Sequence, residues 1–116
     1  MPADLDELIA RLEAASGPDW RLDRDVYRAT NPDKPEPKWA FGLPPLKLTA
    51  SIDAALAIVE EVEPGRSWSL SRDGEANDFE FIFYSQPMRI IAEAKTAPLA
   101  ILIAILRAKK GQSDDK

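Results

Sequence analysis

The sequence contains no cysteine and no histidine. Without cysteine the chain can form no disulfide, no thiolate metal site and no cysteine nucleophile, and its compartment cannot be inferred from redox chemistry. Without histidine it lacks the commonest metal ligand and the commonest general base. Glycine-rich phosphate loops are missing too, because Gly65, Gly74 and Gly111 stand alone. We therefore expect no enzymatic activity, no metal and no cofactor.

Long hydrophobic segments are also lacking. The longest uncharged apolar run, Ala97–Leu106, has ten residues, about half of the roughly 20 needed to span a bilayer. The first 15 residues are charged and amphipathic and contain no apolar signal region. These features predict a protein without a membrane span, located in the cytoplasm.

The composition fits one globular domain. Of the 116 residues, 45% are hydrophobic, and the formal net charge is −5, which argues against direct binding to nucleic acid or to an anionic membrane. The same acidity allows a protein that binds a basic partner. No spacing of carboxylates indicates an acid–base pair, and Glu60, Glu61 and Glu63 are typical of a solvated helix end.

Hydrophobic periodicity predicts three helices in the first 63 residues. The first covers residues 4–15, and Pro18 opens a second that continues to about Ala29. Residues 30–48 hold five prolines and form a loop. Ser51 then caps a third helix, which ends before Pro64. Its expected buried stripe is Ile52, Ala55, Leu56, Val59 and Val62.

The pattern next changes to a period of two, which predicts three strands at residues 66–72, 79–84 and 88–94. Phe79, Phe81 and Phe83 share one face of the second strand. A final helix begins after Thr96 and ends near Lys110. The sequence thus predicts an α+β fold in the order α-α-loop-α-β-β-β-α, with a three-stranded antiparallel sheet covered on both faces as an α-β-α sandwich. Residues 1–110 form the domain, and 111–116 are a disordered tail.

The last helix is apolar around its whole circumference, so it must be buried on more than one side. One side can pack on the sheet. The other can meet a second subunit, which predicts a homo-oligomer, or it can be covered by the two N-terminal helices. The residues expected at the subunit interface are Leu99, Leu102, Ile103 and Leu106.

Aromatic residues beside cations indicate a possible site for a nucleotide, because an aromatic ring stacks on a base and arginine holds phosphate. Such pairs occur at Trp20, Trp39 and Trp68. Trp68 also fits a core position, and Arg107 a helix-end cation. Trp39 and Phe41 lie in the proline-rich loop, where they either fix the loop to the body or form a contact surface. The selected ligand contacts are Trp39, Phe41, Arg66 and Arg107.

Four segments resemble the phage ABA sandwich domain family of small phage and prophage proteins. They are LDELIARLEAASGPDWRLD (5–23), LTASIDAALAIVEE (48–61), RSWSLSR (66–72) and EAKTAPLAILIAILRAKK (93–110). The proline-rich loop departs from the shorter linkers expected in that family. The resemblance implies a phage-encoded accessory protein with helix–sheet–helix architecture. Some small phage proteins of this size block host defence by sequestering cyclic nucleotide signals.

Three functions are therefore open. The first is a phage- or prophage-derived, non-enzymatic protein that binds a nucleotide-type signal, or another host defence component, in the bacterial cytoplasm. The second is an acidic protein–protein inhibitor that presents Asp19–Asp25 and Glu60–Glu63 to a basic partner. The third, an enzyme acting through carboxylates alone, needs two acids that converge in a pocket.

Overall fold

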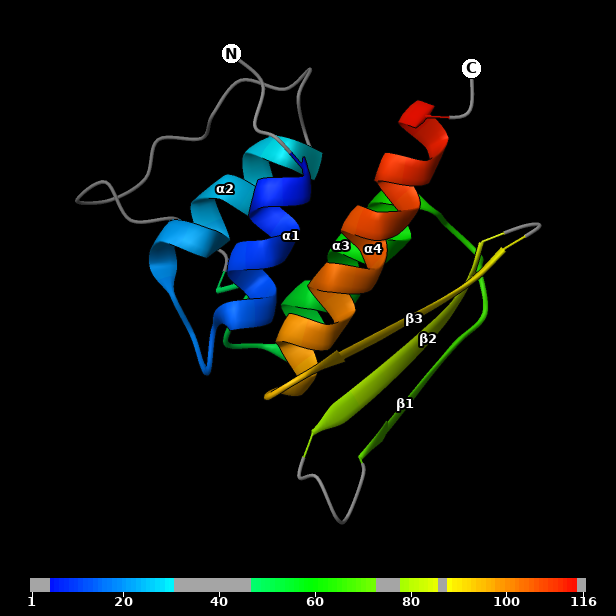
Figure 1. Ribbon diagram of the computed structural model, residues 1–116. Helices are drawn as coiled ribbons and strands as arrows, with labels where there is room; N and C mark the ends of the chain where they lie inside the picture. The colour runs from blue at the N-terminus through cyan, green and yellow to red at the C-terminus, as the bar shows by residue number, and fades with distance from the viewer. Residues whose placement is uncertain (1–4, 31–46, 73–77, 86–87, 115–116) are drawn as a thin grey trace.

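The computed structural model describes residues 5–30, 47–72, 78–85 and 88–114. Within these ranges the chain forms four helices and a three-stranded antiparallel sheet (Figure 1). The α+β fold and the predicted element order are confirmed. The elements are α1 (Leu5–Ala14), α2 (Trp20–Thr30), α3 (Ile52–Val62), β1 (Trp68–Arg72), β2 (Phe79–Ser85), β3 (Met88–Ala94) and α4 (Ala97–Asp114).

The sheet has the strand order β1-β2-β3, so β2 is central. Phe81 and Phe83 point to the helix side and are fully buried, with ring centroids 6.3 Å apart. Trp68, opposite Phe83 on β1, stacks on Phe81 at 5.6 Å but stays 42% exposed. Its assignment to the core was wrong, because β1 is an edge strand and α4 packs on β2 and β3.

Helix α4 is the centre of the fold. It packs on β2 and β3 on one side and on α1 and α3 on the other, and Figure 1 shows it between these layers. Every residue from Leu99 to Leu106 has an exposed fraction of 0%. The helix is apolar all round because its own chain covers it all round.

The burial of α4 corrects the predicted subunit interface. Side chains with no exposed surface cannot contact a second copy in this conformation. The alternative, in which the two N-terminal helices cover α4, is met only by α1, because α3 supplies the rest of the cover and α2 packs on α1. The four corrected residues are Leu99, Leu102, Ile103 and Leu106.

The predicted α-β-α sandwich is also wrong in its layering. All the described helices lie on one side of the sheet (Figure 1). On the opposite face Tyr84 and Ile91 are each 41% exposed. The order of layers is therefore the sheet, then α4, then α1 and α3. Because α4 is apolar and buried on all sides, it supplies enough core for the other face of the sheet to remain in water.

The ends of two helices can be compared with the boundaries that the sequence predicts. Ser51 has extended backbone (φ −131°) and its side chain accepts a hydrogen bond from the Ala54 N–H, which confirms the predicted N-cap of α3. Of the predicted stripe of α3, Ala55 and Val59 are buried and Leu56 and Val62 pack partly buried against the core, but Ile52 is 41% exposed. Ile58, which was not in the predicted stripe, is buried as well. At the other end of the chain, α4 continues to Asp114, four residues beyond Lys110 and through part of the predicted tail.

Candidate functional site

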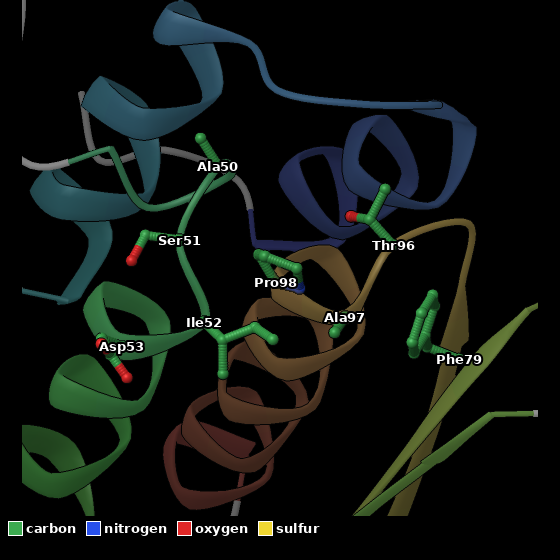
Figure 2. A pocket seen from close by; sticks show the side chains of 8 residues that line it. All are labelled: Ala50, Ser51, Ile52, Asp53, Phe79, Thr96, Ala97 and Pro98. Atoms are coloured by element: carbon green, nitrogen blue, oxygen red, sulfur yellow. The ribbon is translucent and has the colours of Figure 1, made fainter.

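An open depression with a volume of about 580 Å³ lies where the N-terminal ends of α3 and α4 meet the start of β2 (Figure 2). Its walls come from three segments that are distant in the sequence. Residues 50–53 lead into α3, residues 96–98 lead into α4, and Phe79 begins β2. The lining residues are Ala50, Ser51, Ile52, Asp53, Phe79, Thr96, Ala97 and Pro98.

Both helices begin at this depression with a hydroxyl cap. The Ser51 hydroxyl accepts from the Ala54 N–H at 3.2 Å, and the Thr96 hydroxyl accepts from the Leu99 N–H at 3.4 Å. The first N–H groups of a helix have no intrahelical acceptor, and the helix dipole places partial positive charge there. Ala54 and Leu99 donate to the caps and Pro98 has no N–H, so the donors that these two ends offer are the N–H groups of Ile52, Asp53 and Ala97. They favour an anionic group, although the Asp53 carboxylate opposes it.

The remainder of the lining is mostly apolar. Ile52, which is partly exposed, and the ring of Phe79 face the N-terminal end of α4 in Figure 2, whereas Asp53 lies on the other side of Ile52 from Phe79. Arg72 pairs with Phe79 across the sheet, and its guanidinium carbon lies 5.8 Å from the centroid of that ring. A flat apolar group that carries negative charge therefore matches the lining, with the ring and the helix ends as contacts. Arg72 contacts the Phe79 ring but does not line the depression itself.

The residues selected from the sequence are not brought together here. Trp39 and Phe41 lie outside the described residues. Arg66 follows the C-terminal end of α3, where its Nε donates to a Glu63 carboxylate oxygen at 3.2 Å. Arg107 donates to the Ile91 carbonyl oxygen at 2.7 Å and also pairs with Glu13, so it joins α4 to β3 and α1. Both arginines have structural contacts, and neither lines the depression.

Sequence reasoning missed Ile52 and Phe79 as lining residues because it assigned both to the core. The caps Ser51 and Thr96 were recognised, but separately. A linear pattern locates each cap and contains no information on their proximity in space. An aromatic–arginine cluster does form at Trp20, where the guanidinium carbons of Arg21 and Arg24 lie 5.4 and 5.3 Å from the ring centroid, but it does not line the depression.

The acidic segment 19–25 is largely occupied by internal contacts. Asp23 is buried, and one of its carboxylate oxygens accepts from both the N–H and the hydroxyl of Thr49 at 2.7 Å. Asp19 accepts from the Arg21 N–H at 2.8 Å, which caps α2. Asp25 pairs with Arg11 at 2.8 Å. These carboxylates hold α2 to its surroundings, so the segment does not present a row of free charges.

The second acidic segment is divided in the same way. Glu60 and Glu61 are exposed, but Glu63 is buried, and the expectation that it is solvated was wrong. Its Oε1 accepts from Arg66, and its Oε2 has no hydrogen-bond partner among the residues that the structure describes. The continuous acidic face required of an inhibitor against a basic partner is therefore not formed by these residues.

Two further features are absent from the described ranges. No helix in them is long and apolar enough to cross a membrane. Groups of three or more potential metal ligands are likewise not found among the residues that the structure describes. Comparison of the chain with protein-family models, with curated proteins and with solved structures gave no match.

Proposed function

We propose that this chain is a phage- or prophage-derived accessory protein that binds a nucleotide-type ligand without converting it, and thereby withdraws a signal from a host defence system. The origin and the defence role rest on the family resemblance. The ligand class rests on one observation, the convergence of two capped helix ends and the Phe79 ring on one open depression.

The proposed mode of binding uses three contacts. The base lies against Phe79 and Ile52, and the phosphate faces the N–H groups of Ile52 and Asp53 in α3 and of Ala97 in α4. Arg72, over the Phe79 ring but outside the lining, adds positive charge nearby. The volume of about 580 Å³ lies inside the range of roughly 300–1,000 Å³ that is usual for small-molecule sites. Because the depression is open and Asp53 repels anions, we expect affinities in the micromolar range, about −8 kcal/mol or weaker.

Isothermal titration calorimetry with mononucleotides, cyclic dinucleotides, the parent nucleosides and inorganic phosphate tests this mode. We expect the nucleotides to bind more tightly than either part alone, because ring and helix ends act together. Ile52→Glu places a second carboxylate in the depression and should weaken nucleotide binding at least about tenfold, equivalent to roughly 1.4 kcal/mol. Ala57→Glu adds the same charge at another exposed position of α3 and should leave binding unchanged.

Two results would count against the proposal. One is the lack of nucleotide binding at millimolar concentration, and the other is an equal loss in both variants, which would indicate a general effect of charge. The defence role has its own test, which is phage plating on bacteria that carry a nucleotide-signalling defence system. Expression of the protein should raise the plating efficiency, and expression of Ile52→Glu should not. Binding without this effect would leave the ligand class standing and remove the defence role.

A further inference from the structure

The outer face of the sheet combines an exposed apolar centre with charges of opposite sign at its two ends. Alternation along the paired strands places three cross-strand pairs on this face, in order along the strands. They are Glu80 with Glu93, Ile82 with Ile91, and Tyr84 with Arg89. Tyr84, Arg89, Ile91 and Glu93 are exposed, and Glu80 and Ile82 are partly buried.

The charged side chains on this face have no partner among the described residues. Glu80, Glu93 and Arg89 pair through their backbone in the sheet, but within the described ranges no hydrogen bond or ion pair engages their side chains. Glu80 and Glu93 are directly opposite one another, an arrangement of like charges that destabilises a sheet. A cation placed over this pair would relieve the repulsion. Arg89 of the same copy cannot reach the pair, because Glu93 is four residues from Arg89, about 13 Å along the strand.

We propose that a second copy of this chain docks on the outer face of the sheet, with the strands of the two copies running in opposite directions. The two copies are related by a two-fold axis that lies parallel to the sheets, perpendicular to the strands, and passes above the Ile82–Ile91 pair. Rotation about this axis places each strand over the same strand of the second copy and exchanges the two ends of the face. Arg89 then lies over Glu93 of the second copy, and Tyr84 lies over Glu80 of the second copy. Each contact occurs twice, and the isoleucines meet at the axis.

The geometry of sheet packing permits these contacts. Aligned sheets pack about 10 Å apart with strands rotated by about 30°. The Glu80–Glu93 and Tyr84–Arg89 pairs each lie two residues, about 7 Å, from the axis. At that distance the rotation displaces facing residues by about 3.5 Å. Arginine and glutamate side chains can span that offset. The same face shows why a second copy fits better than an unrelated partner, since its charge pattern is complementary to itself after the two-fold rotation.

The area limits the strength of this association. Three strands of up to seven residues cover about 14 Å by 23 Å, well below the roughly 800 Å² per partner of a standard interface. The dimer should therefore be weak, with a dissociation constant between about 1 µM and 1 mM. This inference is independent of the proposed function, because the depression between α3 and α4 lies on the helix side of the sheet.

Sedimentation equilibrium of the full chain, from 5 µM to 1 mM protein and at two salt concentrations, tests the proposal. We expect a monomer–dimer equilibrium that weakens with salt. Arg89→Glu and Glu93→Arg should each weaken it at least about tenfold, because each places like charges face to face at two positions. The double variant Arg89→Glu/Glu93→Arg should recover most of the wild-type affinity, since the pairs are restored with exchanged signs. Glu61→Arg, an exposed reversal on α3, should have no effect.

The charge exchange makes the outcome decisive. A monomer at every concentration overturns the proposal, as does a dimer that the single reversals leave intact. A dimer weakened by the single reversals but not recovered in the double variant overturns the antiparallel arrangement. Circular dichroism of each variant checks that it is folded. Glu61, Arg89 and Glu93 are all exposed, so we expect every variant to fold.

Discussion

Replacing Ile103 by alanine measures whether α4 is an internal core helix. The Ile103 side chain is fully buried at the centre of the fold. Truncation removes three carbons, worth about 2.4 kcal/mol of transfer free energy at 0.8 kcal/mol each. The cavity that remains raises the cost, and the higher helix propensity of alanine returns a few tenths. We expect the free energy of unfolding to fall by about 3 kcal/mol.

This loss is measurable without abolishing the fold, since a domain of 116 residues has a stability of roughly 6–17 kcal/mol. Urea denaturation followed by circular dichroism gives the free energy. Ile52→Ala is the matched control, because it is the same substitution in a helix at a position that is 41% exposed, and it should cost at most about 1 kcal/mol.

The alternative role of α4 as a subunit interface predicts a different result. The cost would then depend on protein concentration, because dissociation would be linked to unfolding. A loss below about 1 kcal/mol for Ile103→Ala would refute the reasoning from burial. So would a denaturation midpoint that still rises with protein concentration in an Arg89→Glu background, in which the proposed dimer of the sheet face is weakened.

Two further predictions concern hydrogen bonds. Thr49→Val removes the hydroxyl that donates to the buried Asp23 carboxylate and should lower the unfolding free energy by about 1–3 kcal/mol in urea denaturation. Thr49→Ser keeps the hydroxyl and should retain most of the stability, and equal losses in the two variants would mean that the methyl group matters instead. Ser51→Ala removes the N-cap of α3 and should cost about 1 kcal/mol in the same assay, and an unchanged stability would show that the bond to the Ala54 N–H contributes nothing.

Local structure was readable from the sequence because its causes are local. The caps Ser51 and Thr96 were predicted, and so were the strands around the three phenylalanines. The site was not readable in the same way. Arg66 and Arg107 were chosen because they lie near aromatic residues in the chain or at a helix end, but the structure uses them to bind Glu63 and the Ile91 carbonyl.

The errors in packing have a common cause. Ile52 and Trp68 fit an apolar stripe, yet both are exposed because a period states which residues share a face and not what covers that face. Asp23 and Glu63 show the reverse error, since polar residues were assigned to solvent while tertiary contacts bury them. Burial of a carboxylate depends on partners such as Thr49 that are distant in the sequence.

The sequence by itself determined the elements, their order and the requirement that the helix after Thr96 be buried all round, since hydrophobic period and capping act over a few residues. Only the tertiary structure decided that its own chain buries this helix, that the helices share one side of the sheet, and that two helix ends meet at Phe79. These three features depend on which apolar faces pack together. Several pairings would bury a similar area, and only the packing of the whole chain selects one of them.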